Sequence, residues 1–388
     1  MGPFATHILA DMGADVIKIE SPEGDSVRGY QPSRNAGMSG IFINLNRNKR
    51  SICLDLKSAE GRETLDRLIE TSDVFLHNLR PKAMERLGYT YERVRRLKED
   101  IVYCGAFGFG SQGPYSDKAA YDDLIQAGSG LAALHTGIRG EPGYVPTVVC
   151  DKLAGQAIAY AILAGLLQRE RFGIGQAIEV PMFETAVEFN FIEHIDGFAF
   201  LPPLGKPVFP RVMSKQRKPY RTKNSYACIL PYSDKNWLDF YEFTGRHEFE
   251  SDSRFRRLPD RVLHIDTLYK MIEEEAIKRT TEEWVQFCDR VGIPCMPVVA
   301  LEEVPDDPHV KAVGLFISAE HPTEGSYRTI RRPVLFSESP FHIARHAPRH
   351  GQHTVEVLTE LGLSRKEINR VLAANGSVSD CPKDSGAR

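Results

Sequence analysis

The 388-residue chain has little net charge and no long apolar run. Its 49 Lys and Arg residues nearly balance its 52 Asp and Glu residues, which gives a formal charge of −3 at pH 7. Without excess positive charge there is no overall field that favours nucleic acid or an anionic membrane, so an anionic ligand must be met by a local basic pocket. No apolar segment approaches the ~20 residues of a membrane helix, and the N-terminus lacks a signal-peptide pattern. We therefore expect a cytoplasmic protein that binds neither nucleic acid nor membrane.

Cysteine is scarce and scattered along the chain. The seven cysteines include no CxxC pair and no Cys/His spacing typical of zinc sites, which predicts reduced thiols and no metal centre. Cys150 lies beside Asp151 and could be read as a nucleophile. An isolated Cys in an apolar stretch is more often a small core residue, and we favour that interpretation.

Several catalytic and nucleotide-binding motifs are also missing. The chain contains no GxGxxG, no GxxxxGK[ST], no GxSxG and no HExxH. The dinucleotide-binding, P-loop, serine-hydrolase and zincin classes therefore receive no support from local motifs.

The chain does contain an alternation of strand and helix patterns. Apolar residues at helical spacing predict a helix over 2–12 and another that begins near Asp151. Short apolar and β-branched runs predict strands over 15–20, 51–56, 73–77, 101–104 and 177–180. This alternation predicts an α/β fold with a doubly wound, Rossmann-like parallel sheet, in which ligands bind at the carboxyl ends of the strands.

The composition changes after residue 190 and indicates a second, smaller domain. Pro, Lys and Arg with little periodicity over 201–223 predict a linker, and a strand at 226–230 followed by helices predicts a small α+β domain. One further helix pattern lies within 351–372. The predicted organisation is a large domain over 1–190, a linker over 191–222, a small domain over 223–300, a return linker over 301–330, the rest of the large domain over 331–375 and a disordered tail over 376–388.

Short motifs follow one another in order along nearly the whole chain. They include Gly2-Pro3, Gly13-Ala14-Asp15, Asn48-Lys49-Arg50, Asn78-Leu79-Arg80-Pro81, Arg86-Leu87-Gly88, Ala120-Tyr121-Asp122, Gly175-Gln176, Gly292-Ile293-Pro294 and Asp307-Pro308. This series resembles class III CoA-transferases, the CaiB/BaiF group that includes formyl-CoA transferase and carnitine CoA-transferase. The resemblance starts at Gly2-Pro3, without the strand that usually precedes this pair. It has no match near 205–220 to the glycine-rich flap of formyl-CoA transferase, so it does not imply formyl-CoA or oxalate chemistry.

The resemblance implies a reaction and a nucleophile. In this family an aspartate attacks an acyl-CoA thioester and forms a mixed anhydride. The CoA thiolate then converts this anhydride into an aspartyl-CoA thioester, from which CoA is transferred to a free carboxylate. By its position in the motifs, Asp151 is that aspartate. A place at a helix N-terminus suits the role, because the helix dipole favours the ionised carboxylate. The competing interpretation of Asp151 is an ordinary N-cap.

The resemblance also implies a CoA site and no tightly bound cofactor, with acyl-CoA and a small carboxylic acid as substrates. It assigns the polar contacts to Lys57, Asn78, Arg80 and Arg86, with Leu54, Leu56 and Leu79 along the path and Tyr121 and Asp122 near the thioester. Arg and Lys are the side chains that bind phosphate groups most readily. For each basic residue the alternative is a solvated charge, and for Tyr121 it is a buried, hydrogen-bonded hydroxyl.

Three further expectations follow. The basic residues between 211 and 223 could bind an acceptor carboxylate, but we favour a solvated loop. The resemblance implies an interlocked homodimer whose chains cross near 190–222 and 300–330. The rival functions are an α-methylacyl-CoA racemase and a catalytically silent CoA-binding protein. Tyr121 disfavours the racemase, because it stands where that enzyme has a His and a tyrosine hydroxyl ordinarily keeps its proton near neutral pH.

Overall fold

Parallel strands organise the first part of the chain. In the computed structural model, which describes residues 1–376, β1 (Val16–Glu20) pairs in parallel with β2 (Lys49–Cys53). A three-stranded parallel sheet follows, with β4 (Val102–Phe107) between β3 (Val74–His77) and β5 (Gln176–Pro181). The predicted alternation of strands and helices is thus found, with strand ends shifted by a few residues.

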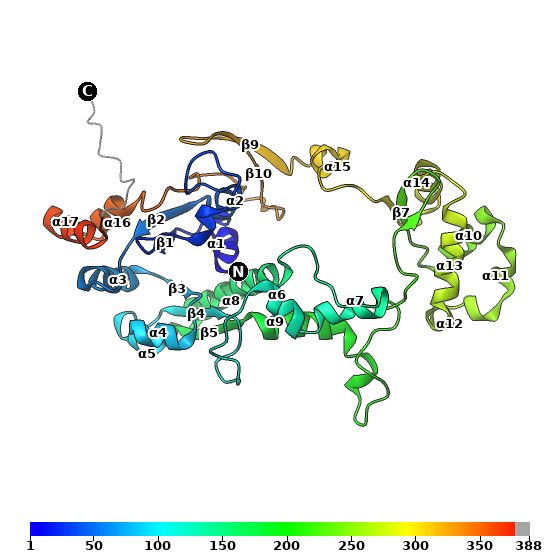
Figure 1. Ribbon diagram of the computed structural model, residues 1–388, viewed down its shortest axis with the longest axis horizontal. Coiled ribbons are helices and arrows are strands. Elements are labelled where there is room, and N and C mark those ends of the chain that lie inside the picture. The colour runs from blue at the N-terminus through cyan, green and yellow to red at the C-terminus, as the bar shows by residue number, and fades with distance from the viewer. Residues whose placement is uncertain (377–388) are drawn as a thin grey trace. The chain divides into compact units, whose positions relative to one another are not determined.

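Helices cover both faces of the three-stranded sheet (Figure 1). On one face, α1 (Gly2–Asp11) and α8 (Val149–Phe172) pack against Cys104 and Ala106 of β4. On the other face, α3 (Ala59–Thr71), α4 (Pro81–Leu87) and α5 (Tyr91–Leu97) pack around the ring of Tyr103. All six residues of β4 are buried, as expected for a central parallel strand that carries apolar side chains on both faces.

The long helix α8 begins at Val149, two residues before the predicted start, and ends at Gly173 in the left-handed conformation. By length and composition alone it could cross a membrane, which corrects the prediction that no apolar run approaches that length. Its buried residues, including Ile158 and Ile162, pack in the core of this unit against α1 and the sheet. A Cβ on Gly155 would lie 2.8 Å from the Phe4 ring, so the glycine allows α1 to approach α8 closely.

The C-terminal part of this unit differs from the prediction in two places. The predicted return linker over 301–330 contains an antiparallel hairpin, β9 (Phe316–His321) with β10 (Gly325–Ile330). Where one helix pattern was predicted there are two helices, α16 (Thr354–Glu360) and α17 (Arg365–Ala374), which bury Leu358 and Val371 with the core residues of β2 and α3. The predicted tail lies outside the described residues from 377 onward.

The chain divides into two units whose boundaries interleave along the sequence. The first comprises Met1–Ser129, Val145–Val187 and the chain from His309 onward, and the second comprises Gly130–Tyr144 and Glu188–Pro308. Their remaining helices are α2 (Gly40–Asn46), α6 (Asp122–Gly128), α7 (Leu131–Arg139), α9 (Met182–His194), α11 (His247–Ser251), α12 (Leu258–Leu263) and α15 (Pro308–Ala312).

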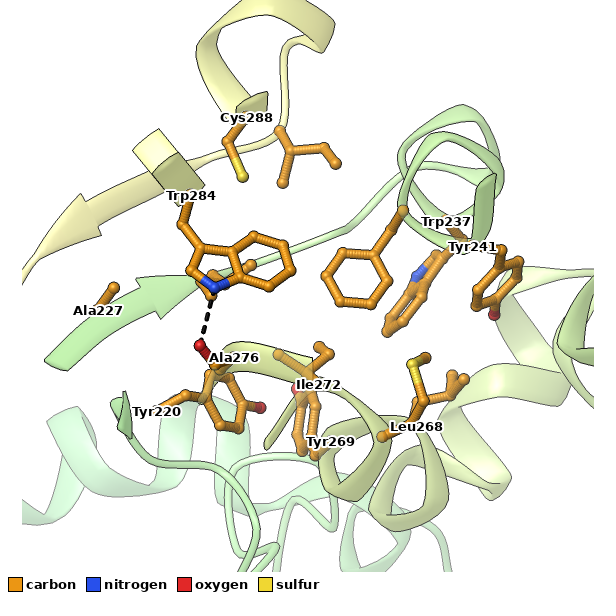
Figure 2. Packing of buried hydrophobic residues seen from close by; sticks show 14 of the residues in the cluster. Tyr220, Ala227, Trp237, Tyr241, Leu268, Tyr269, Ile272, Ala276, Trp284 and Cys288 are labelled. Atoms are coloured by element: carbon orange, nitrogen blue, oxygen red, sulfur yellow. Dashed lines mark hydrogen bonds between the residues drawn. The ribbon is translucent and has the colours of Figure 1, made fainter. Parts of the chain in front are cut away.

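The second unit has its own aromatic core. A small antiparallel sheet of β6 (Tyr220–Arg221), β7 (Tyr226–Ile229) and β8 (Cys295–Pro297) packs with α10 (Asp234–Thr244), α13 (Ile265–Ala276) and α14 (Thr281–Val291). Figure 2 shows Trp284 at the centre, where its indole N–H donates to the Ala276 carbonyl at 2.9 Å. The ring of Trp284 stacks on Phe240 at 5.6 Å between centroids. This combination of a short sheet and helices matches the predicted small α+β composition.

Candidate active site

Asp151 lies in the first turn of α8, as the third helical residue after Val148, which is the N-cap. The interpretation of Asp151 as an ordinary N-cap is therefore wrong. Its side chain is 37% exposed, and Oδ1 accepts a hydrogen bond from the Met1 nitrogen at 2.9 Å. A carboxylate in the first turn of a long helix lies in the favourable field of the helix dipole and remains open to a ligand.

A second carboxylate fixes the main chain of Asp151. Asp122 opens α6, is buried, and its Oδ1 accepts the Asp151 N–H at 2.9 Å. Its other oxygen, Oδ2, accepts a hydrogen bond from the Gln126 amide at 2.6 Å. Val148 offers no side-chain cap, so Asp122 satisfies one of the free N–H groups of α8 from a neighbouring helix. The structure thus brings together Asp122 and Asp151, two of the predicted site residues.

The two residues that adjoin these carboxylates have contrasting environments. Cys150 is buried, and burial, together with the charges of Asp122 and Asp151, raises the pKa of its thiol to about 12. Cys150 is therefore a neutral core residue, as predicted. Tyr121 precedes α6 and is 82% exposed, so the alternative of a buried, hydrogen-bonded hydroxyl is wrong.

The residues predicted to bind CoA lie where strands β2 and β3 end. Leu54, Leu56 and Lys57 follow β2, and Asn78, Leu79 and Arg80 follow β3 and lead into α4, which carries Arg86 near its end. Lys57, Asn78, Arg80 and Arg86 are exposed. The Arg80 guanidinium donates to the Asp117 carbonyl at 2.7 Å. Leu54 is only 1% exposed and packs in the core, and its N–H donates to the Glu20 carbonyl at 2.9 Å, so its side chain does not line a ligand path.

The loop after β2 is held by a residue far away in the sequence. The Asn375 amide donates to the Cys53 carbonyl at 2.7 Å, and its oxygen accepts the Asp55 N–H at 2.9 Å. Arg62 donates to the Leu56 and Lys57 carbonyls at 3.2 and 2.8 Å. The segment that presents Lys57 is therefore fixed by hydrogen bonds on both sides.

The loop after β4 is held by carboxylates. Glu179 accepts hydrogen bonds from the Ser111 N–H and hydroxyl at 2.5 and 2.7 Å, and Glu184 accepts the Gly110 N–H at 3.0 Å. A Cβ on Gly108 would lie 2.2 Å from the Ala120 Cβ, so only glycine fits there. Because β3 and β4 are parallel, this loop and the Asn78–Arg80 segment leave the sheet at the same edge.

Sequence reasoning missed Gln126, Asn375 and Glu179 as residues that shape this site. Asp122 and Gln126 stand four residues apart, a spacing that brings side chains together on a helix, and this is a signal that could have been used. Asn375 and Glu179 gave no local signal, because their partners are distant in the sequence.

The basic residues between 211 and 223 lie in the second unit. Lys215, Arg217, Lys218, Arg221 and Lys223 are exposed. Lys218 pairs with Glu273 at 2.7 Å, and Arg211 lies over the ring of Tyr232 at 5.1 Å. These features agree with the solvated-loop interpretation. Within residues 1–376, no group of three His, Cys, Asp or Glu side chains is arranged to hold a metal ion.

Comparison with known proteins gives a consistent result over nearly the whole chain. The sequence pattern of CoA-transferase family III matches residues 1–354. A formyl-CoA:oxalate CoA-transferase of Rhodopseudomonas palustris (strain BisA53) is 30% identical over 100% of this chain and 96% of the relative. A succinate–glutarate CoA-transferase of Agrobacterium fabrum is 32% identical over 93% and 92% of the two chains. Among solved structures, a CaiB/BaiF family protein from Brucella suis matches with a TM-score of 0.77 and 27% identity, over 92% of this chain and 95% of that one.

Proposed function

The chain belongs to CoA-transferase family III, as its motifs predicted, and from this premise we propose that it moves coenzyme A from an acyl-CoA thioester to a free carboxylic acid. The observation that supports the proposal most directly is the placement of Asp151. Its carboxylate is partly exposed at the start of a 24-residue helix, and its main chain is anchored to the buried Asp122. A nucleophile needs both access to the substrate and a fixed position.

The proposed reaction proceeds through covalent aspartyl intermediates. The Asp151 carboxylate attacks the thioester carbonyl, the C–S bond breaks, and CoA leaves as the thiolate while a mixed anhydride forms. The thiolate attacks the aspartyl carbonyl of the anhydride, which releases the donor carboxylate and leaves an Asp151–CoA thioester. The acceptor carboxylate then attacks this thioester, which breaks its C–S bond and forms a second mixed anhydride with release of the thiolate. The thiolate attacks the acceptor carbonyl of that anhydride to give the new acyl-CoA, and the Asp151 carboxylate leaves. Each step exchanges one acyl bond for another, and the last step regenerates Asp151.

The experiment that tests this mechanism is covalent trapping. The names of the relatives suggest formyl-CoA and succinyl-CoA as donors, with oxalate, succinate and glutarate as acceptors. With a donor that supports turnover, we expect the peptide that contains Asp151 to carry the mass of CoA, and hydroxylamine to remove it. A label on Cys150 instead would contradict the mechanism, and no transfer with any donor and acceptor would contradict the function.

We propose that the phosphates of CoA bind at the carboxyl ends of β2 and β3. Arg80, between β3 and α4, and Arg86, in the last turn of α4, are exposed and present guanidinium groups, which suit phosphate oxygens. We expect Arg80→Ala or Arg86→Ala to weaken CoA binding by about ten- to a hundredfold in titration calorimetry, since a charged hydrogen bond contributes about 1.5–3 kcal/mol.

The matched control for this prediction is Arg217→Ala, which removes an exposed arginine from the second unit. It should leave CoA affinity unchanged. Equal losses in the arginine variants of the two units would show that CoA does not bind where we propose.

We also propose that the protein is a homodimer with interlocked chains. Large apolar side chains are exposed on α8, at Tyr160, Leu163 and Leu167, and on α9, at Phe189 and Ile192. Large apolar side chains exposed on one helix are typical of a subunit interface. We expect a dimer of about twice 43.6 kDa in sedimentation velocity at micromolar concentration. A stable monomer under these conditions would contradict the proposal.

A further inference from the structure

We propose that Gln126 is a positioning residue for the reaction, which fixes the Asp151 nucleophile through the carboxylate of Asp122. The inference rests on the proposed function, because it takes Asp151 as the nucleophile. It concerns a side chain that acts on Asp151 through the carboxylate of Asp122, to which it donates a hydrogen bond.

The Gln126 amide is fully buried and uses both of its ends. Its Nε2 donates to Asp122 Oδ2 at 2.6 Å, and its Oε1 accepts the Val145 N–H at 2.9 Å. The same Nε2 also lies 3.5 and 3.4 Å from the Val145 and Thr147 carbonyls. Gln126 therefore ties α6 to the segment that leads into α8.

The Asp122 carboxylate continues this chain of hydrogen bonds. One oxygen accepts from Gln126, and the other accepts the main-chain N–H of Asp151. A buried carboxylate needs such partners, because an unsatisfied charge in the interior is costly. Loss of the Gln126 amide would leave Asp122 Oδ2 without this donor and free the carboxylate to rotate or recruit water. The anchor of the first turn of α8 would then move.

A shift of that anchor would reach the reacting atoms. The attacking oxygens of Asp151 are only a few bonds from the main-chain nitrogen that Asp122 holds. A displacement of about 1 Å at a reacting group can lower a rate by ~100-fold. Substrate binding at the ends of β2 and β3 would be little affected, because Gln126 lies on α6 and contacts α6 and the segment 145–147. Gln126 should therefore influence kcat rather than the affinity for CoA.

Few other charged or titratable groups lie near the hydrogen bond between Gln126 and Asp122. Asp151 is held by the Met1 nitrogen, Lys152 donates to the Thr147 hydroxyl at 2.6 Å, and Cys150 is a neutral thiol. Asp122 Oδ2 accepts from the neutral amide of Gln126, and Oδ1 accepts the main-chain N–H of Asp151. A carboxyl introduced at position 126 would thus meet the negative charge of Asp122 without a cation between them.

The test uses Gln126→Glu, which keeps the size and shape of the side chain. A protonated Glu can donate to Asp122 and accept from Val145, as Gln does, whereas an ionised Glu can only accept and would repel Asp122 at about 2.6 Å. Burial and the neighbouring carboxylate both raise the pKa of the new group. The protonated form, which can donate to Asp122, is therefore present below that pKa and lost above it. We expect kcat of the full-length variant to be near wild type at pH 5.5 and to fall by ~100-fold towards pH 9, relative to wild type at each pH. KM for the acyl-CoA donor should change little.

Two comparisons keep the test decisive. Gln286→Glu adds the same charge at an exposed position of α14 in the second unit and should follow the wild-type pH profile. Gln126→Met keeps the volume but removes both hydrogen bonds, so its kcat should be ten- to a hundredfold lower at every pH. If circular dichroism shows that Gln126→Glu unfolds at high pH, the kcat of Gln126→Met tests the proposal instead. Wild-type kcat in Gln126→Met, or a Gln126→Glu profile parallel to wild type, would overturn the proposal.

Failure of this inference can be told apart from failure of the proposed function. If wild-type protein forms no CoA adduct on Asp151, the proposed function fails. If the adduct forms on wild-type protein and the Gln126 variants transfer CoA at wild-type rates and pH profiles, only the role of Gln126 is wrong.

Discussion

Replacement of Asp151 by Asn will give a folded protein that no longer transfers coenzyme A. The main-chain N–H of residue 151 keeps its bond to Asp122, so the first turn of α8 should be unchanged. The amide cannot form the anhydride, and loss of a catalytic nucleophile can cost up to about 10⁶ in rate. We expect a fall of at least ~1,000-fold in kcat, measured by chromatography of the CoA thioesters with the best donor and acceptor. Thermal unfolding should be close to wild type.

Two companion variants sharpen this result. Asp151→Glu keeps the charge but moves the attacking oxygen by about one ångström, so we expect a loss of ~100-fold. Asp123→Asn removes the exposed carboxylate next to Asp122 and should retain wild-type activity. Wild-type transfer by Asp151→Asn would rule out the proposed mechanism.

Truncation of Trp284 to Ala will loosen the second unit and leave the first unit intact. Trp284 is fully buried, donates to the Ala276 carbonyl and stacks on Phe240. Removal of a buried Trp typically costs about 3–5 kcal/mol, because both transfer energy and packing are lost. Native-state hydrogen exchange with peptide resolution should show this loss of protection in α10, α13 and α14.

Trp284→Phe is the matched control, since it keeps an aromatic ring but removes the indole N–H. We expect it to cost about 1–3 kcal/mol, which corresponds to the unpaired Ala276 carbonyl and the smaller ring. Peptides from β3, β4 and α8 should exchange as in wild type for both variants. An equal loss of protection in both units would show that the two units do not unfold independently.

The sequence predicted the parallel strands and the long helix because their signals are local. β4 reads as a continuous apolar run, and α3 starts at a Ser, a typical N-cap residue, because the Ser58 hydroxyl accepts the Gly61 N–H at 2.9 Å. The hairpin β9–β10 escaped prediction because its strands mix charged and polar residues, as expected where only part of a sheet is buried. The interpretation of Asp151 as an N-cap was wrong, because Val148 is the N-cap of α8 and the side chain that accepts a first-turn N–H is Asp122, 29 residues before Asp151.

The candidate site shows the same difference between local signals and long-range contacts. Asp151 and the basic residues after β2 and β3 could be selected from motifs, because each is marked by the residues beside it. Their supports could not be selected in this way. Asn375 lies 322 residues from the Cys53 carbonyl to which it donates, and no pattern in either segment points to the other. Contacts of this range become visible only once the chain is folded.

The aromatic core of the second unit also has an optical consequence. The chain has two tryptophans, Trp237 and Trp284, and both are buried in that core. Intrinsic tryptophan emission is therefore a reporter confined to one half of the molecule, while far-ultraviolet circular dichroism sums the helices of both. In a denaturant titration, the unfolding curves from the two signals would coincide only if both units unfold together. A difference between the two transition midpoints would therefore report the separate stabilities of the units without any label.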